Sequence, residues 1–371
     1  MIKKIAFIGG RDIHSLGGIE NYMFNLSQIL AKRGYEVVVY SESDHNGVSF
    51  ENGVKIVSWK TFHWNLIDKP IFGVLSTLHT IFIERKVDLI HYNAWGPSLA
   101  SWIPFLLGKK TLMQGHGLEW QRTKYSPVQQ KIMKFMEMVT AYLNRNIIMV
   151  SQDQTDFFKR SYGRICTTIP PGIPKPVIPS DQATTTFLQK YGLHKDSYFL
   201  YLGRLVQDKN PDVLIQAFLK LKTQKVKLVM AGDNPADPGY VKYLKDLCRS
   251  NPDIVFTGSV FGEEKYALLN SALAYCIPSV LEGLPISLLE AMSFGKYCIA
   301  SDIPGCREAL GEQGVFVPLQ DLCNGFAAEM DDIAHHPEKR DSQGSQNRER
   351  ALKNFIWDRI ADKYVDYISR I

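Results

Sequence analysis

The sequence predicts an α/β fold with two doubly wound, Rossmann-like domains that face each other across a cleft. Short apolar runs alternate with helical patterns, a proline-rich stretch interrupts this alternation, and the alternation then restarts. Such alternation is typical of parallel sheets covered by helices on both faces. Ligands of these sheets bind beyond the carboxyl ends of the strands, so we expect the chemistry in loops that follow strands.

The first half of the chain contains a series of short apolar runs that we interpret as strands. They are residues 5–8, 37–40, 55–57, 89–91, 111–114, 147–150 and 167–169. A helix follows the first strand and ends at Gly34. Its apolar residues share one helical face, at Ile19, Tyr22, Met23, Leu26, Ile29 and Leu30.

A cluster of prolines between residues 170 and 179 cannot be helical and makes a semi-rigid connector. We place the domain boundary here, with residues 1–172 as the first domain and residues 173–354 as the second. The C-terminal helix, at about residues 355–371, is expected to pack back on the first domain.

The second half repeats the alternation of strands and helices. Expected strands are residues 198–202, 227–231, 254–257, 273–277, 297–300 and 315–317. Expected helices are residues 211–221, 240–249, 263–270, 287–294, 322–335 and 348–371. The highly charged segment 337–354 is expected on the surface.

Composition argues against several classes of protein. The 43 Lys and Arg against 38 Asp and Glu give a net charge of +5, too diffuse for a nucleic-acid partner. The 6 cysteines include no Cys-x-x-Cys pair, which predicts reduced thiols and no zinc site. The first apolar run ends at Ile8, too short for a secretory signal, and no apolar stretch is long enough to span a bilayer. We therefore expect a cytoplasmic protein.

Gly17 and Gly18 stand immediately before the first helix. Glycine lets a ligand approach the backbone closely, and the unpaired amides at a helix start favour an anion. The pair fits a phosphate or a sugar; the alternative is a flexible turn with Gly18 as the N-cap. The pattern Gly-x-Gly-x-x-Gly is absent, so neither a nicotinamide nor a flavin cofactor is expected.

The strand at residues 198–202 leads into a loop, 203–210, that carries two cations. Arg204 can donate to two phosphate oxygens and Lys209 adds a point charge, so the pair suits a diphosphate. Pro211 then occupies a favoured first position of a helix. The alternative is a solvated loop with ordinary surface charges.

Two glutamates follow the strand at residues 273–277. Glu282 lies in a loop beside Gly283, and Glu290 lies on the next helix among apolar neighbours. A carboxylate there is costly without a hydrogen-bonding partner, and vicinal sugar hydroxyls are suitable donors. The open amides at residues 283–287 can face a phosphate. The alternative is a helix salt bridge or a solvated glutamate.

Together with further segments, these residues resemble the retaining GT-B glycosyltransferases of family 4. The spacing of Glu282 and Glu290, with Arg204 and Lys209 upstream, is the specific part of the resemblance. The matching segments are Gly17-Gly18-Ile19-Glu20, His116-Gly117, Gly203-Arg204-Leu205 with Lys209, Ala231-Gly232, Phe256-Thr257-Gly258, Pro278-Ser279 and Glu282 with Glu290-Ala291.

The resemblance implies a role for each matching residue. Arg204 and Lys209 would bind the donor diphosphate, Glu290 the ribose and Glu282 the transferred sugar. His116 would lie near that sugar, so the implied catalytic set is His116, Arg204, Lys209 and Glu282. Further donor contacts would come from Gly17, Gly18, Gly203, Gly258, Val260, Gly283, Leu284 and Pro285. The family needs no metal, the chain has no Asp-x-Asp motif, and no cofactor is expected.

The segment 116–125 is similar to bacterial rhamnosyltransferases of capsule and O-antigen assembly. It reads His-Gly-Leu-Glu-Trp followed by basic and aromatic residues, although Tyr125 stands where family members often have Trp. The similarity implies acceptor-side roles for Glu119, Trp120, Arg122 and Lys124.

The span 128–145 combines an apolar helical face with Lys131, Lys134 and Arg145. Such a stripe is either part of the core or a basic amphipathic surface for peripheral contact with a membrane. The apolar residues are Ile132, Phe135, Met136, Val139, Tyr142 and Leu143.

The expected activity is transfer of a hexose or deoxyhexose, such as rhamnose, with retention. The expected partners are a nucleoside-diphosphate sugar as donor and a saccharide, lipid-linked at the inner face of the membrane, as acceptor in surface polysaccharide synthesis. Two alternatives stay open: a sugar-nucleotide epimerase of the same fold, and a non-catalytic protein that binds nucleotide-sugars or sugars. No side chain stands out as a nucleophile.

Overall fold

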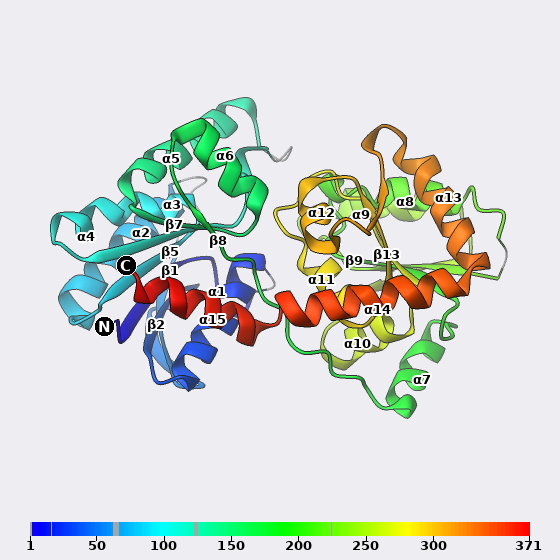
Figure 1. The fold of residues 1–371 in the computed structure, drawn as a ribbon, viewed down its shortest axis with the longest axis horizontal. Helices are drawn as coiled ribbons and strands as arrows, with labels where there is room; N and C mark the ends of the chain where they lie inside the picture. Colours follow the sequence, from blue (N-terminus) through cyan, green and yellow to red (C-terminus); the bar gives the residue numbers. More distant parts are fainter. Residues whose placement is uncertain (1, 16, 62–66, 122–124, 224) are drawn as a thin grey trace. The chain divides into compact units, whose positions relative to one another are not determined.

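The computed structural model describes residues 2–15, 17–61, 67–121, 125–223 and 225–371. The chain divides into two compact units (Figure 1). Unit 1 comprises Met1–Gly172 and Trp357–Ile371, and unit 2 comprises Ile173–Ile356. Each unit contains one sheet, and the described strands are parallel except β3. The predicted α/β class with two doubly wound sheets is confirmed.

The sheet of unit 1 has the strand order β3-β4-β2-β1-β5-β6-β7-β8. Its strands are β1 (Lys4–Gly9), β2 (Glu36–Ser43), β3 (Gly47–Glu51), β4 (Val54–Lys60), β5 (Leu89–Asn93), β6 (Lys110–Gly115), β7 (Asn146–Met149) and β8 (Thr167–Thr168). Its α-helices are α1 (Gly18–Lys32), α2 (Asp68–His79), α3 (Trp95–Ser98), α4 (Trp102–Leu106), α5 (Pro127–Leu143), α6 (Gln152–Tyr162) and α15 (Trp357–Ser369).

The central strand β1 is buried on both faces. Ile5 and Phe7 lie in the core cluster that includes α1 and α15, whereas Ala6 and Ile8 lie in the cluster that includes Phe72 of α2. Successive side chains of a strand point to opposite faces, so a continuous apolar run fits a strand covered by helices on both sides.

The edge of this sheet contains a hairpin that the sequence analysis missed. β3 pairs antiparallel with β4, and the two strands are joined by Asn52 and Gly53, with φ of 49° and 82°. A two-residue turn with positive φ at both positions matches the twist of a hairpin. The Asn-Gly dipeptide was therefore an available signal.

The C-terminal helix α15 belongs to unit 1 and packs alongside α1 (Figure 1). Tyr364 is fully buried and its hydroxyl lies 2.9 Å from Nδ1 of His91 on β5. The single helix predicted at residues 348–371 is wrong. Ile356 forms a β-bridge with Ile173, whose N–H donates to the Phe355 carbonyl at 2.8 Å, and this extended pairing interrupts the helix.

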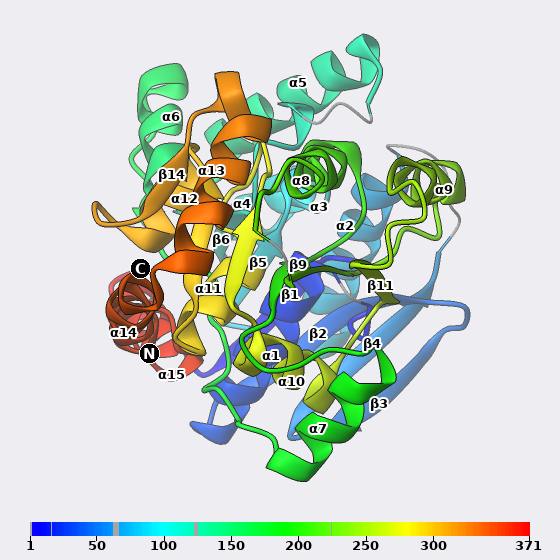
Figure 2. The same ribbon diagram turned by 90° about the vertical axis from the view of Figure 1, so that its right-hand side faces the viewer.

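Unit 2 has a parallel sheet with the strand order β11-β10-β9-β12-β13-β14. In Figure 2, β9 lies between the edge strands β11 and β14. Its strands are β9 (Tyr198–Leu202), β10 (Lys227–Ala231), β11 (Ile254–Gly258), β12 (Ala274–Ile277), β13 (Tyr297–Ser301) and β14 (Val315–Val317). Its α-helices are α7 (Asp181–Lys190), α8 (Pro211–Phe218), α9 (Pro238–Leu247), α10 (Gly262–Ser271), α11 (Ile286–Ser293), α12 (Pro304–Leu310), α13 (Leu322–His335) and α14 (Pro337–Asn354). Helices α7 and α12 were not among the predicted elements.

Alternate residues of β9 divide the core of unit 2 into two clusters. Tyr198 and Leu200 lie in the cluster that includes residues of α10 and α11, and Phe199 and Tyr201 lie in the cluster that includes residues of α8 and α13. Both faces of the sheet are therefore covered by helices, as a doubly wound sheet requires.

Helix α14 corrects the expectation that the charged segment 337–354 lies wholly on the surface. One of its faces is buried, where the amide oxygen of Gln343 accepts a hydrogen bond from the Cys298 N–H at 2.9 Å. Asn347 donates to the Lys296 carbonyl at 2.9 Å on the same face. The sequence analysis missed this buried face because side-chain amides, rather than apolar side chains, make these contacts.

No helix within the described part of the chain is long and apolar enough to cross a bilayer.

Candidate functional site

In unit 2, the strand order reverses between β9 and β12. The chain runs from β9 outward to β10 and β11, then returns to β12 and continues outward to β13 and β14. Such a switch point opens a crevice at the carboxyl ends of the two strands. The loop 203–210 follows β9 and the loop 278–285 follows β12, so both lie at this crevice.

The two loops are hydrogen-bonded to each other. The Val280 N–H donates to the Asp208 carbonyl at 3.0 Å, and the Asn210 side chain donates to the Pro278 carbonyl at 3.2 Å. Asn210 has a φ of 46°, in the left-handed region that asparagine tolerates better than most residues, and it immediately precedes α8. This conformation turns the chain from the loop into the helix.

The crevice brings together two of the predicted site residues. Nζ of Lys209 lies 2.7 Å from Oε1 of Glu282, and the Ser279 hydroxyl donates to the same oxygen at 3.0 Å. Oε2 of Glu282 accepts no hydrogen bond from the described residues. Arg204 is exposed, and its guanidinium has no hydrogen-bond or ion-pair partner in the described ranges. Sequence reasoning gave no role to Ser279.

The predicted Glu290 lies on α11 and is only 9% exposed. Its Oε1 lies 2.6 Å from Nζ of Lys265 on α10. This ion pair is the salt bridge that the sequence left open as an alternative, and it supplies the partner that a buried carboxylate needs. Oε2 of Glu290 accepts no hydrogen bond from the described residues. Lys265 was missed because nothing in the sequence links it to α11.

The loop before α11 lies against α12. A Cβ at Gly305 would come within 2.7 Å of the Glu282 and Gly283 carbonyl oxygens, so glycine permits this close approach. Pro285 is the N-cap of α11 and provides no side-chain cap. The Leu288 and Leu289 N–H groups donate to the Pro285 carbonyl at 3.1 and 3.2 Å, which leaves the amides of Ile286 and Ser287 without an acceptor among the described residues.

Two further glycines shape the carboxyl edge of unit 2. Gly232 follows β10 with a φ of 156°, and a Cβ there would overlap the Gly203 carbonyl oxygen. Gly258 ends the edge strand β11 with a φ of 72°, and Val260 beyond it is buried. The predicted donor residues Gly203, Gly258 and Val260 thus lie at or just beyond the carboxyl ends of strands.

In unit 1, the switch point lies between β1 and β5, and the glycine pair lies in the loop after β1. Gly17 is the N-cap of α1, which corrects the alternative that placed Gly18 there. The carboxylate of Glu20 accepts a hydrogen bond from the Arg11 N–H at 2.7 Å. A Cβ at Gly17 would overlap this carboxylate, whereas a Cβ at Gly18 would meet open space. The Glu20 carboxylate therefore packs against the loop at Gly17 and holds it through the Arg11 N–H.

His116 follows β6 at the same edge. Its Nε2 lies 3.3 Å from Oδ1 of Asn93, the last residue of β5. The centroids of the His116 and Tyr22 rings lie 5.1 Å apart, in an edge-to-face arrangement. Burial lowers the pKa of His116 to about 3, so the ring is neutral at physiological pH. Asn93 was missed because a polar residue at a strand end has no distinctive sequence signal.

Of the four acceptor-side residues, Arg122 and Lys124 lie outside the described residues. Glu119 and Trp120 begin the 3-10 turn η3 (Glu119–Gln121). The Trp120 indole N–H lies 3.3 and 3.2 Å from the two carboxylate oxygens of Glu137 on α5. Trp120 is therefore anchored to α5.

Glu137 is fully buried and also accepts a hydrogen bond from the Tyr162 hydroxyl at 2.8 Å. Burial raises the pKa of Glu137 to about 7 despite these donors. Lys134 lies over the Trp120 ring, 4.7 Å from its centroid. The sequence gave no reason to expect a buried acid here.

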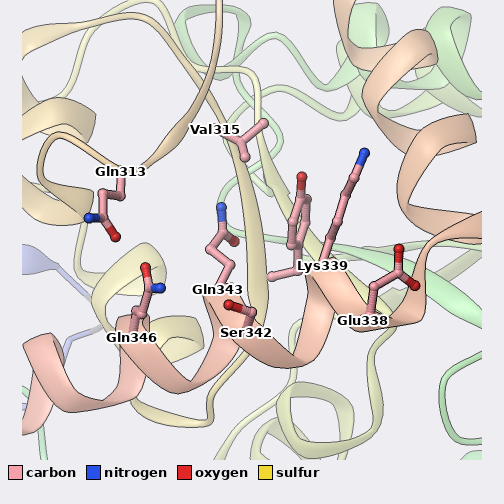
Figure 3. Close-up of a pocket in the computed structure, with 8 residues that line it drawn as sticks. Gln313, Val315, Glu338, Lys339, Ser342, Gln343 and Gln346 are labelled. Atoms are coloured by element: carbon pink, nitrogen blue, oxygen red, sulfur yellow. The ribbon is translucent and has the colours of Figure 1, made fainter.

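A pocket of about 500 Å³ lies elsewhere in unit 2 (Figure 3). Tyr297 and Val315, which line it, begin β13 and β14, so the pocket lies at the amino ends of these strands. Gln313 and several polar residues of α14 complete its wall. Its position, at the edge opposite the loops 203–210 and 278–285, excludes it from the candidate site.

Within the described ranges, no group of three or more His, Cys, Asp or Glu side chains is placed to hold a metal ion. All six cysteines are free thiols, and four of them are buried: Cys248, Cys276, Cys298 and Cys306.

Comparison with known proteins covers both halves of the chain. The family described as Glycosyl transferases group 1 matches residues 184–350, and the family described as Glycosyltransferase Family 4 matches residues 16–175. O-antigen chain mannosyltransferase C of Escherichia coli is 23% identical over 385 residues, covering 96% of this chain and 95% of that protein.

Solved structures share the whole fold. Sucrose-phosphate synthase from Thermosynechococcus elongatus superposes with a TM-score of 0.84 at 20% identity, over 99% of this chain and 98% of that one. Anabaena HepE in complex with UDP and glucose gives a TM-score of 0.78 at 17% identity, over 100% of both chains. The rhamnosyltransferase subgroup stays a prediction. Since two glycosyltransferase families account for nearly all of the sequence and the fold is that of GT-B enzymes, the chain belongs to the group 1 glycosyltransferases.

Proposed function

We propose that this enzyme transfers a hexose or deoxyhexose from a nucleoside-diphosphate sugar to a saccharide acceptor, with retention of configuration and without a metal ion. The observation that carries the proposal is the charged crevice between β9 and β12. There Lys209, Glu282 and Arg204 lie on two loops that are hydrogen-bonded to each other.

The crevice suits a diphosphate leaving group. Arg204 has free donors for two phosphate oxygens, and Lys209 adds a second positive charge. The open amides at the start of α11 add further donors to an anion. When the bond between the sugar carbon and the diphosphate oxygen breaks, these groups stabilise the charge that develops on the diphosphate, which is the electrostatic role a metal ion has in other enzymes.

Two carboxylates in unit 2 suit the neutral parts of the donor. Oε1 of Glu290 stays in the ion pair with Lys265, and Oε2 can accept hydrogen bonds from ribose hydroxyls. Oε1 of Glu282 accepts hydrogen bonds from Lys209 and Ser279. Its Oε2 can therefore accept hydrogen bonds from hydroxyls of the transferred sugar. In each case the cation orients the carboxylate before substrate binds.

Unit 1 offers neutral hydrogen-bonding groups, which suit a sugar. Asn93 is in register with Gly9, the last residue of β1, and the uncharged ring of His116 contacts Tyr22 of α1. We assign saccharide binding to this edge and take the acceptor to be lipid-linked, in surface polysaccharide synthesis on the cytoplasmic side of the membrane. The likeness to an O-antigen chain mannosyltransferase supports this choice of pathway class.

Calorimetric titration with UDP, GDP, ADP and dTDP tests the donor site. We expect at least one diphosphate to bind wild-type protein and Arg204→Ala to bind it at least tenfold more weakly. Lys242→Ala, at an exposed lysine of α9, is the matched control and should bind normally. Absence of binding by every nucleotide, or equal binding by Arg204→Ala, would overturn the donor site.

Turnover with the corresponding nucleotide-sugar separates the proposal from its alternatives. A transferase releases the diphosphate and forms a glycoside whose anomeric configuration, read by NMR, equals that of the donor. An epimerase would convert the donor sugar without an acceptor, and a binding protein would release no diphosphate.

A further inference from the structure

Helix α5 carries large apolar side chains outward and polar ones inward. Ile132, Phe135 and Tyr142 are 43%, 60% and 61% exposed, whereas Glu137 and Thr140 are fully buried. A helix on the surface of a water-soluble domain normally has the opposite arrangement. The interpretation of these three apolar residues as core is therefore wrong, and their exposure needs another explanation.

Helix α4 begins near the C-terminal end of α5, where the Asn144 side chain donates to the Ser101 hydroxyl at 3.0 Å, and it also exposes large apolar side chains. Trp102, Phe105 and Leu106 are 48%, 46% and 71% exposed. The Arg145 guanidinium, just beyond α5, lies 5.2 Å from the centroid of the Phe105 ring and joins the two helices. We call the six residues Trp102, Phe105, Leu106, Ile132, Phe135 and Tyr142 the apolar–basic face, because basic residues flank them.

The exposed charged residues on α4, on α5 and directly after each of these helices are all basic. Lys109 and Lys110 follow α4, Lys131 and Lys134 lie on α5, and all four are exposed. The only acidic residue of the two helices is Glu137, which is buried.

The sequence from residue 95 to residue 151 contains seven Lys or Arg and two acidic residues, an excess equal to the net +5 of the whole chain. This local excess of positive charge favours an anionic partner.

We propose that the apolar–basic face docks on the surface of an anionic phospholipid bilayer. Apolar side chains at the boundary between headgroups and acyl chains, with lysines at the phosphates, are the arrangement of interfacial helices. Trp102 and Tyr142 have the ring type enriched at that boundary. The proposal concerns where the enzyme works and goes beyond its donor chemistry.

A second copy of the chain is a poorer occupant. A two-fold interface would set the same patch against itself and bring the lysines of both copies together. Like charges held in proximity disfavour association, whereas anionic headgroups neutralise them.

Co-sedimentation of the full chain with vesicles tests the proposal. We expect binding to vesicles of phosphatidylcholine mixed with phosphatidylglycerol to exceed binding to phosphatidylcholine alone by about tenfold, and to fall as salt rises. Phe135→Glu and Leu106→Glu should each lower the bound fraction severalfold. Phe50→Glu is the matched control, since Phe50 on β3 is 74% exposed and lies outside the face.

Thermal unfolding of each variant shows whether it is folded. Lys131→Gln is a milder variant, which should lose only the preference for anionic lipid. The proposal fails if wild-type protein binds neither vesicle, or if Phe50→Glu loses as much binding as Phe135→Glu. It also fails if sedimentation velocity shows a dimer that Phe135→Glu dissociates, because the face would then be a contact between copies.

Discussion

The candidate site residues at the carboxyl edges of the two sheets differ in charge. In unit 2, Lys209 and Glu282 form an ion pair beside an exposed Arg204. In unit 1, Asn93 and His116 meet through a hydrogen bond, and the low pKa of His116 keeps the ring neutral. The charged residues of unit 2 can bind an anion, whereas Asn93 and the neutral His116 can bind hydroxyls without a cost in desolvated charge. We therefore assign the phosphates to unit 2 and a sugar to unit 1.

The largest expected effect comes from removing the charge of the unit 2 edge. Lys209→Ala deletes a cation from the diphosphate and leaves Glu282 without its ion-pair partner, so kcat/KM should fall by about 100- to 1000-fold. Steady-state kinetics with the nucleotide-sugar identified by titration measures this loss, with Lys242→Ala as the control. Unchanged diphosphate affinity in Lys209→Ala would break the assignment of phosphates to this edge.

A second prediction concerns the contribution of the Lys265–Glu290 ion pair to stability. Lys265→Met should lower the free energy of unfolding by about 3 kcal/mol, because it leaves a carboxylate that is nearly buried without a counter-charge. The double variant Lys265→Met/Glu290→Gln should recover most of the loss, as urea denaturation will show. If the double variant is no more stable than Lys265→Met, the ion pair is not the cause.

A third prediction contrasts Glu290, which has a cation at 2.6 Å, with Glu137, whose hydrogen-bond donors are neutral. The pKa of Glu137 rises from 4.5 to about 7 on folding, so between these values the native state keeps a proton that the unfolded chain has lost. Stability therefore decreases as pH rises through this window and levels off above it, by at most about 3 kcal/mol.

Glu137→Gln tests this pH dependence, because glutamine keeps the hydrogen-bonding geometry but cannot ionise. Urea denaturation at several pH values between 4.5 and 7 should show a flatter profile for the variant than for the wild type. Two parallel profiles would contradict the raised pKa.

The smallest expected effect concerns the neutral pair Asn93 and His116 in unit 1. Asn93→Ala removes the hydrogen-bond partner of His116 and should lower kcat/KM by about tenfold. The affinity for the nucleoside diphosphate should stay at the wild-type value, which also reports that the variant is folded. An equal loss of nucleotide affinity would show that the two edges do not divide the substrate as assigned.

Much of the fold could be predicted from the sequence because its strands are short, buried and apolar. The bounds of β9 and β10 coincide with the predicted runs. Because ligands of parallel sheets bind beyond the carboxyl ends of the strands, the loops that carry Arg204 and Glu282 could be selected as candidates. The hairpin of β3 and β4 carried a usable signal in Asn52 and Gly53 that was overlooked.

The partners of the site residues could not be predicted, since they depend on how helices pack. Lys265 reaches Glu290 only because α10 and α11 flank the same core cluster, and no local pattern encodes that contact. Helix α5 shows the same limit, because hydrophobic periodicity identifies a face but does not say whether that face turns inward. Glu137 is buried on one side while Phe135 is exposed on the other.

The return of α15 to unit 1 has a consequence for the order in which the protein is made. Residues 357–371 leave the ribosome after all of unit 2, yet Trp357, Ile360 and Tyr364 belong to the core of unit 1. Domains ordinarily fold as they emerge, with the first-made domain first. Here the first unit to be synthesised is the last to be completed, so a nascent chain that stops at Ile356 carries a full unit 2 beside a unit 1 that lacks one of its helices.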